Sequence, residues 1–174
     1  MAYGERATAL TQNELTIVDL GARVTDTASE RIRIEASAQR CLEIALDFER
    51  YPEWAKDVKA AKVIEVDSEG RGAQVEFRAA ALGKSVRYTL EYDYSALPAE
   101  FSWHFVEGDL LRRLDGSYRF EADPDTDASP STRVHYDLAV EVAVPLPGLV
   151  KRRAASLIMG TALKELKKHI ESVA

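Results

Sequence analysis

From Val63 to Val142 the chain alternates between apolar and polar side chains with a period of two. Turn sequences such as residues 82–84 and 107–109 divide this region into runs of strand length. Such alternation is typical of antiparallel strands that bury one face and expose the other. Short connections favour a meander in which consecutive strands pair. The sequence therefore predicts one large antiparallel sheet.

The residues before this region predict one more strand and two short helices. A first alternating strand ends near Ile34, and Ser37 is suited to cap the helix that follows. Pro52 suits the first turn of a second short helix. Residues 1–27 show no sustained period, so we expect a mobile N-terminal arm. Residues 28–174 are then expected to form one domain, which is an ordinary size for a single fold.

A long amphipathic helix is predicted from Leu149 to about Val173. Its apolar stripe is predicted to contain Ala155, Ile158, Met159, Ala162, Leu166, Ile170 and Val173. A lone long helix and a long meander can bury their apolar faces together only if the sheet curls around the helix. The predicted fold class is α+β, with a curved seven-stranded antiparallel sheet around a long C-terminal helix and two short helices after the first strand.

The apolar face of this sheet is rich in large aromatic residues, whereas the helix stripe contains small ones. Large concave walls against a small-residue helix leave volume for a ligand, and hydroxyls among apolar walls are typical of small-molecule sites. The other interpretation is that the rings fill the core. The residues that strand parity and the helical stripe place at such a cavity are Phe77, Tyr88, Leu90, Tyr92, Trp103, Phe105, Tyr118, Tyr136, Ala155, Ile158 and Ala162.

Arg112 has two interpretations. Counting by twos from Tyr118 places Arg112 on the inward face, where a guanidinium needs an acid or an anionic ligand group. A bulge at Gly116 would instead reverse the phase and leave Arg112 as an exposed arginine near the end of a strand. We include Arg112 among the candidate ligand-binding residues, and both interpretations are open at this stage.

Composition and motif spacing disfavour several classes of function. A net charge of -6 disfavours nucleic-acid binding, which needs a basic surface. The three histidines and Cys41 lack metal-ligand spacing, and no phosphate-binding loop or nucleophile motif occurs, so we expect no metal, cofactor or catalytic set. No apolar run approaches the length needed to cross a bilayer, and residues 1–10 lack the apolar stretch of a signal peptide. We therefore expect a cytoplasmic protein without stable membrane insertion.

Several segments, in the order of the predicted elements, carry a family resemblance. They are Asp47–Trp54 after the first helix, Phe101–Trp103, Leu111–Tyr118, Thr132–Tyr136, and Pro145–Pro147 before the long helix. Residues 29 to 173 resemble the START-like, SRPBCC or helix-grip superfamily, the polyketide cyclase/dehydrase and lipid-transport group. The resemblance implies a helix-grip fold with a ligand cavity.

The same resemblance implies that Tyr51 and Trp54 lie near the pocket entrance. The other interpretation is an aromatic staple that packs the short helices on the sheet. Members of the superfamily include polyketide aromatase/cyclases, plant hormone receptors, lipid-transfer proteins, coenzyme Q-binding proteins and a ribosome-associated toxin. Because they share a cavity and not a catalytic set, the fold alone does not give the function.

The favoured function is to bind or carry a small apolar molecule, such as a lipid, a quinone or a polyketide-like compound, in an internal cavity. The first alternative is an enzyme of the cyclase/aromatase type, which would need an acid or base inside the pocket. Strand parity points Glu76, Glu91, His104 and His135 outward instead. The second alternative is a protein- or ribosome-interaction module, which the acidic charge disfavours. The sequence specifies no oligomeric state.

Overall fold

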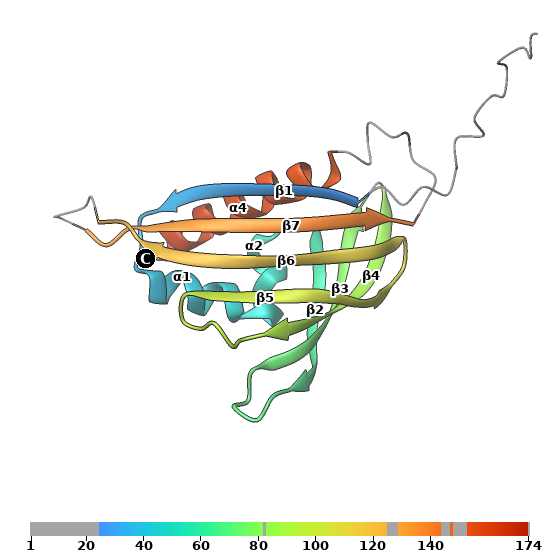
Figure 1. Cartoon of the computed structure of the whole chain (residues 1–174), viewed down its shortest axis with the longest axis horizontal. Coiled ribbons are helices and arrows are strands. Elements are labelled where there is room, and N and C mark those ends of the chain that lie inside the picture. The colour runs from blue at the N-terminus through green and yellow to red at the C-terminus, as the bar shows by residue number, and fades with distance from the viewer. Residues whose placement is uncertain (1–24, 82, 125–128, 144–146, 148–152, 174) are drawn as a thin grey trace, which may run out of the picture.

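The structure is a computed structural model that describes residues 25–81, 83–124, 129–143, 147 and 153–173 (Figure 1). Its elements, in chain order, are β1 (Thr25–Ile34), α1 (Ala38–Leu46), the 3-10 helix η1 (Phe48–Arg50), α2 (Tyr51–Trp54), β2 (Val58–Val66), β3 (Gly72–Ala81), β4 (Lys84–Asp93), β5 (Glu100–Gly108), β6 (Leu111–Ala122), β7 (Thr132–Val142) and α4 (Ala154–Ser172).

The strands form a single 7-stranded sheet in the order β1-β7-β6-β5-β4-β3-β2. Every neighbouring pair is antiparallel, and β2 to β7 follow one another as a meander. The predicted fold class is confirmed. Residues 25–27, which were predicted to belong to the N-terminal arm, form the start of β1, and the rest of that arm lies outside the described residues.

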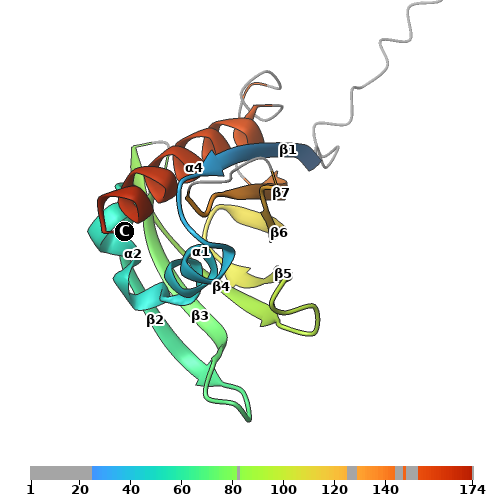
Figure 2. The same cartoon turned by 90° about the vertical axis from the view of Figure 1, so that its left-hand side faces the viewer.

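The sheet curves strongly, and α4 crosses its concave side diagonally (Figure 2). The helix packs mainly on β1 and β7, at one edge of the sheet. The short elements α1, η1 and α2 cover one end of the concave side, where η1 and α2 contact β2. Because α4 lies over one edge, it leaves the inner surfaces of the middle strands uncovered along part of their length.

The side of α4 that faces the sheet is fully buried at Ala155, Met159, Leu163, Leu166 and Ile170. This stripe differs from the predicted one, which omitted Leu163 and included Ile158 and Val173. Those two side chains are 40% and 47% exposed. The helix packs against the β1–β7 edge and not the middle of the sheet, so its buried stripe is rotated from the one predicted.

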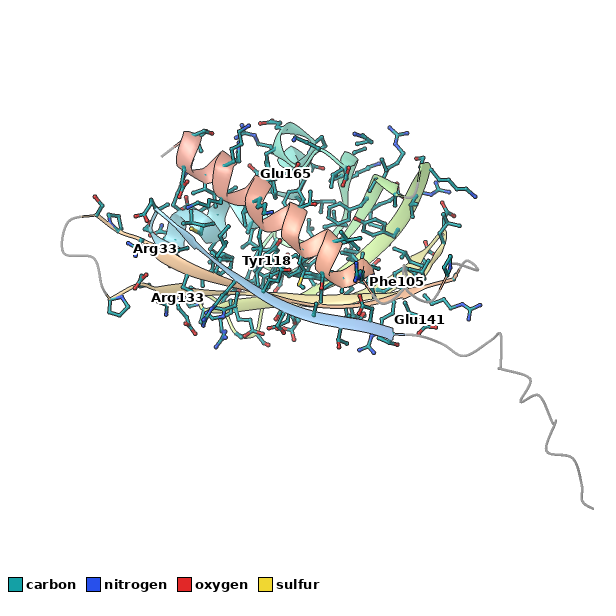
Figure 3. The ribbon with its side chains drawn as sticks, turned by 90° about the horizontal axis from the view of Figure 1, so that it is seen from above. Arg33, Phe105, Tyr118, Arg133, Glu141 and Glu165 are labelled. Atoms are coloured by element: carbon teal, nitrogen blue, oxygen red, sulfur yellow. The ribbon has the colours of Figure 1, made fainter. Side chains whose placement is uncertain are left out.

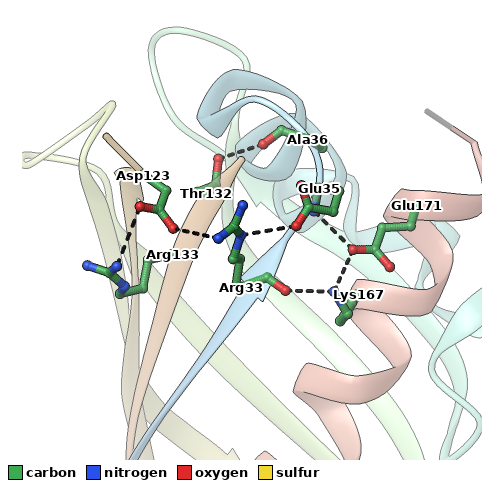
Figure 4. A network of polar contacts seen from close by, with 8 residues as sticks. All are labelled: Arg33, Glu35, Ala36, Asp123, Thr132, Arg133, Lys167 and Glu171. Atoms are coloured by element: carbon green, nitrogen blue, oxygen red, sulfur yellow. Dashed lines mark hydrogen bonds and ion pairs between the residues drawn. The ribbon is translucent and has the colours of Figure 1, made fainter. Parts of the chain in front are cut away.

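Hydrogen bonds tie both ends of α4 to β1. At the first turn, the Asp26 carboxylate accepts the backbone N–H of Ala155 at 2.8 Å. Near the other end, the Lys167 ammonium donates to the Arg33 carbonyl at 2.7 Å (Figure 4). These contacts fix the position of the helix along one edge strand, which leaves its other side free to face an opening.

A buried acid closes the end of the sheet where β6 meets β7. The Asp123 side chain is 2% exposed and pairs with Arg33 and Arg133, each at 3.6 Å (Figure 4). Its backbone N–H donates to the Ser131 carbonyl at 2.9 Å. Asp123 therefore continues the hairpin beyond the last residue of β6, in the connection to β7. Burying a carboxylate here is tolerable because two guanidinium groups accompany it.

Candidate functional site

A cavity of about 600 Å³ lies between the concave face of the sheet and the first half of α4. This volume is within the range of roughly 300–1,000 Å³ that is usual for small-molecule sites. Figure 3 shows Tyr118 in the space between α4 and the sheet. The wall takes residues from β2 to β7, from α2 and from α4, and it is mostly apolar.

Aromatic rings from four neighbouring strands form the sheet side of the cavity. Tyr92 of β4 is paired with Trp103 of β5, and their rings are 6.1 Å apart. Tyr118 of β6 is paired with Tyr136 of β7, with ring centroids 4.4 Å apart. The Trp103 ring is 5.5 Å from the Tyr118 ring and so joins the two pairs. Alternation within each strand places these rings on one face, and the register aligns them into a continuous wall.

The helix side of the cavity combines small and exposed apolar residues. Ala154 and Ala162 are half-buried on the wall. Leu157 and Ile158 also line the cavity, although they are 65% and 40% exposed. An apolar side chain that touches both the cavity and solvent marks its rim. Gly83, in the exposed turn between β3 and β4, belongs to the same wall.

Neutral hydroxyls supply most of the polar groups inside the cavity. Burial raises the pKa of Tyr88, and burial followed by the influence of neighbouring tyrosines raises the pKa of Tyr92 and Tyr136. Burial likewise raises the pKa of Tyr118, which shares a side-chain hydrogen bond with Tyr136. All four phenols are therefore protonated at neutral pH, and they offer hydrogen bonds without charge.

Tyr51 and Trp54 line the α2 side of the cavity. The Tyr51 hydroxyl donates to the Ala45 carbonyl at 2.6 Å, and its ring lies 4.7 Å from the Trp54 ring. The Trp54 indole stacks on the His169 imidazole of α4 at 6.0 Å. The two residues thus connect α1, α2 and α4 as an aromatic staple. Their predicted role at the entrance stays a prediction.

The structure brings most of the predicted site residues together on this wall. They are Tyr51, Trp54, Phe77, Tyr88, Leu90, Tyr92, Trp103, Tyr118, Tyr136, Ile158 and Ala162. The three predicted residues outside the wall are Phe105, Arg112 and Ala155. Of these, Ala155 is fully buried and lies on the side of α4 that packs against the sheet.

Irregular pairing accounts for the positions of Phe105 and Arg112. Beyond Trp103, β5 no longer pairs with β6, and the Phe105 N–H instead donates to the Asp115 carboxylate at 2.9 Å. In β6, the pairing with β7 shifts between Leu111 and Arg113, so Arg112 is exposed at a bulge. The phase reversal that would expose Arg112 does occur, but at this bulge and not at Gly116.

Some wall residues were missed by the sequence analysis. Phe101, Leu114 and Val140 line the cavity from β5, β6 and β7. Each has the parity of a predicted neighbour on its own strand, so strict alternation could have found all three. Leu157 and Thr161 of α4 also line the cavity. No sequence signal marks these two, because they depend on how α4 is rotated.

The described residues contain no cluster of histidine, cysteine and acidic side chains that could hold a metal ion. His104 pairs with Glu91 at 2.8 Å and His135 with Glu121 at 3.1 Å, and neither histidine lines the cavity. Within the described part of the chain, no helix is both long and apolar enough to cross a membrane.

Comparison with solved structures finds the same fold in several proteins. A START superfamily protein from Mycobacterium smegmatis has 24% identity and a TM-score of 0.77, with 85% of this chain and 99% of that chain covered. A protein from Thermus thermophilus has 24% identity and a TM-score of 0.68, with the same coverage. The Zhui aromatase/cyclase from Streptomyces sp. R1128 has 11% identity and a TM-score of 0.64, covering 85% of this chain and 94% of that one.

No curated protein matches the chain in sequence. The family model described as polyketide cyclase / dehydrase and lipid transport matches residues 25–171, from the start of β1 almost to the end of α4. The match spans the sheet, the short helices and the helix that together form the cavity. The chain therefore belongs to the START-like polyketide cyclase/dehydrase and lipid-transport family.

Proposed function

We propose that this protein binds and carries a small apolar molecule, of the lipid, quinone or polyketide-like kind, in the cavity beneath α4. The observation that carries the proposal is the cavity of about 600 Å³ with a continuous aromatic wall. Protein interiors pack densely and leave few voids larger than a water molecule. A space of this size among apolar rings therefore favours an occupant over an empty core.

The energetics of burial support such an occupant. Transfer of an apolar molecule from water into the cavity contributes about 0.8 kcal/mol for each buried CH₂ group. A ligand with ten such groups would gain roughly 8 kcal/mol before the cost of association. The partly exposed rim residues Leu157 and Ile158 give an apolar molecule contacts on its way into the cavity. We therefore place the entrance beside the first turns of α4.

The composition of the wall favours binding over acid–base catalysis. Among the described wall residues, Asp57 is the only one with a carboxylate, and it is exposed. The buried tyrosines hold their protons, so they can donate hydrogen bonds but cannot act as bases at neutral pH. A cyclase-type activity is the alternative proposal, and it would rely on these phenols as acids.

Binding of Nile red, a neutral apolar dye, to variants of one strand tests the proposal. Trp103→Ala removes a wall residue, and its neighbour His104→Ala removes an exposed one. We expect Trp103→Ala to change the dye affinity about five- to hundredfold, equivalent to about 1–3 kcal/mol, and His104→Ala to leave it unchanged. An effect of His104→Ala alone, in folded variants, would contradict the proposed site.

A second pair of variants fills the cavity instead of enlarging it. Ala162→Trp projects a ring into the cavity from α4, whereas Lys164→Trp adds the same ring on the exposed side of the helix. Ala162→Trp should weaken dye binding at least about tenfold, because the ring occupies the ligand volume. Native mass spectrometry of the purified protein, with extraction of any co-purified molecule, would identify the natural occupant. Equal dye binding by both variants would place the dye elsewhere.

A further inference from the structure

The described wall of the cavity offers hydroxyls but no cationic side chain. No lysine, arginine or histidine is among its described residues. Arg112, the one predicted cation, lies outside the cavity at the bulge in β6. Among the wall residues that the structure describes, Asp57 carries the single charge, and it is exposed. The buried depth of the described wall is therefore electrically neutral.

Among the phenols of the described wall, Tyr88 and Tyr92 are free to serve a ligand, whereas Tyr118 and Tyr136 share a hydrogen bond. The phenols of Tyr51 and Tyr94 donate to backbone carbonyls, at 2.6 Å each, and are thus already occupied. By contrast, Tyr88 and Tyr92 line the cavity, and among the described residues no hydrogen bond to either hydroxyl is present. No fully buried side-chain oxygen or nitrogen in the described residues lacks a partner, so these two hydroxyls are exposed to the cavity.

These hydroxyls belong to one polar region of the cavity. The pKa of Tyr92 is raised by burial and then by the nearby phenols of Tyr51 and Tyr88. The pKa of Tyr136 is also raised by burial and then by Tyr118 and Tyr88. The geometry agrees, because Tyr92 pairs with Trp103 and the Trp103 ring lies 5.5 Å from the Tyr118 ring. A ligand in the cavity would therefore face phenols from β4, β6 and β7.

Neutral donors select among ligands by charge. A ligand carbonyl or hydroxyl oxygen needs only a hydrogen bond, which a phenol provides. A carboxylate needs a cation or full hydration, and burying it among apolar rings without either is very costly. An apolar molecule without any oxygen would leave the phenol donors without partners.

We propose that the cavity selects uncharged apolar ligands that carry a carbonyl or hydroxyl oxygen, bound by the Tyr88 and Tyr92 hydroxyls, and that it excludes carboxylates such as free fatty acids. This inference rests on the proposed binding function and specifies its ligand class. Within the lipid, quinone and polyketide-like range, it favours neutral quinones, polyketides and lipid alcohols or ketones.

A set of compounds on one ring frame tests the selectivity. Fluorene, 9-fluorenone, 9-fluorenone-2-carboxylate and the methyl ester of that acid are each used to displace Nile red from the full chain at pH 8. We expect the ester to bind at least about tenfold more tightly than the carboxylate, because only the anion loses its hydration without a partner. Equal affinities for the ester and the carboxylate would overturn the inference.

The hydroxyl assignment is tested by the ratio of 9-fluorenone affinity to fluorene affinity. In the double variant Tyr88→Phe/Tyr92→Phe, this ratio should fall about two- to tenfold, since the rings remain and only the donors are lost. Tyr94→Phe is the matched control, because its hydroxyl bonds to the Gly72 carbonyl and the residue does not line the cavity. The same fall in both variants, or no fall in the double variant, would refute the assignment.

An added cation should reverse the exclusion. Ile158→Arg places a guanidinium at the rim, where the native side chain is already part-exposed, and Ile158→Met is the control of similar length. We expect the carboxylate to gain at least about tenfold in affinity from Ile158→Arg only. If none of the compounds binds and Ala162→Trp leaves Nile red binding unchanged, the proposed function fails. If the neutral compounds bind but the carboxylate binds equally well, only the ligand class fails.

Discussion

Gly116 of β6 occupies a position where the structure leaves no room for a side chain. It pairs with Trp103 of β5 on one side and with Leu138 of β7 on the other. A Cβ atom added at Gly116 would lie 2.6 Å from Cζ2 of Trp103 and 2.5 Å from the Asp137 carbonyl oxygen. The second atom belongs to the backbone, so rotation of a side chain cannot relieve that contact. Gly116→Ala must therefore displace both the β7 backbone and the Trp103 indole of the cavity wall.

We expect Gly116→Ala to lower the free energy of unfolding by about 1–3 kcal/mol, which is the usual range for overpacking a core. For a domain of this size, each kcal/mol lowers Tm by roughly 2–4 °C, so Gly116→Ala should lower Tm by about 2–12 °C. Gly160 in α4 is a matched control, because the nearest atoms to its added Cβ are the Glu30 carboxylate oxygens, at 3.8 and 3.9 Å. Replacing this helical glycine with alanine should stabilise the protein by about 0.5–1 kcal/mol.

Thermal melting followed by circular dichroism, at one protein concentration, measures both variants. The two substitutions are chemically identical, so opposite shifts in Tm would come from the local packing. A double-mutant cycle adds a further test: in a Trp103→Leu background the cost of Gly116→Ala should be smaller, because one of the two close contacts is gone. A Gly116→Ala protein that melts at or above the parent temperature would refute the close approach of the indole to β6.

Two further predictions concern α4. Leu166→Asp should lower the free energy of unfolding by more than about 4 kcal/mol, because it buries an unpaired carboxylate where the native side chain is fully buried. Lys164→Asp, on the exposed side of the helix, should change this free energy by less than about 1 kcal/mol. Similar urea midpoints for the two variants would show that the helix packs through a different side. The second prediction concerns Glu171. Burial opposes ionisation of this carboxyl, but hydrogen bonds from Lys167 and the Glu35 N–H outweigh it and lower the pKa. Its stabilising contribution is thus present above its ordinary pKa of about 4.3 and is lost as the pH falls through the lowered value. The Glu171→Gln variant should therefore have a lower free energy of unfolding than the parent at pH 7, and this difference should shrink on acidification. A difference that stays constant from pH 7 to about pH 3.5 would contradict the prediction.

The sequence alone determined the features that depend on local periodicity. Period-two alternation predicted the strands, and parity within a strand placed Tyr88, Tyr92 and Trp103 on the same inward face. The same parity placed His104 outside, where it pairs with Glu91. These assignments succeed because side-chain direction in a regular strand is a property of the backbone and is independent of distant contacts.

Only the tertiary structure decided the features that depend on how elements meet. The bulge in β6 that exposes Arg112, and the end of β5–β6 pairing that moves Phe105 off the wall, arise from the register between strands. The rotation of α4, which buries Leu163 and turns Ile158 toward the cavity rim, follows from its packing on the β1–β7 edge. The cavity depends on this placement as well. Periodicity specifies which side of each element is apolar, but contacts between residues far apart in the chain determine the register, the rotation of the helix and the volume that remains between them.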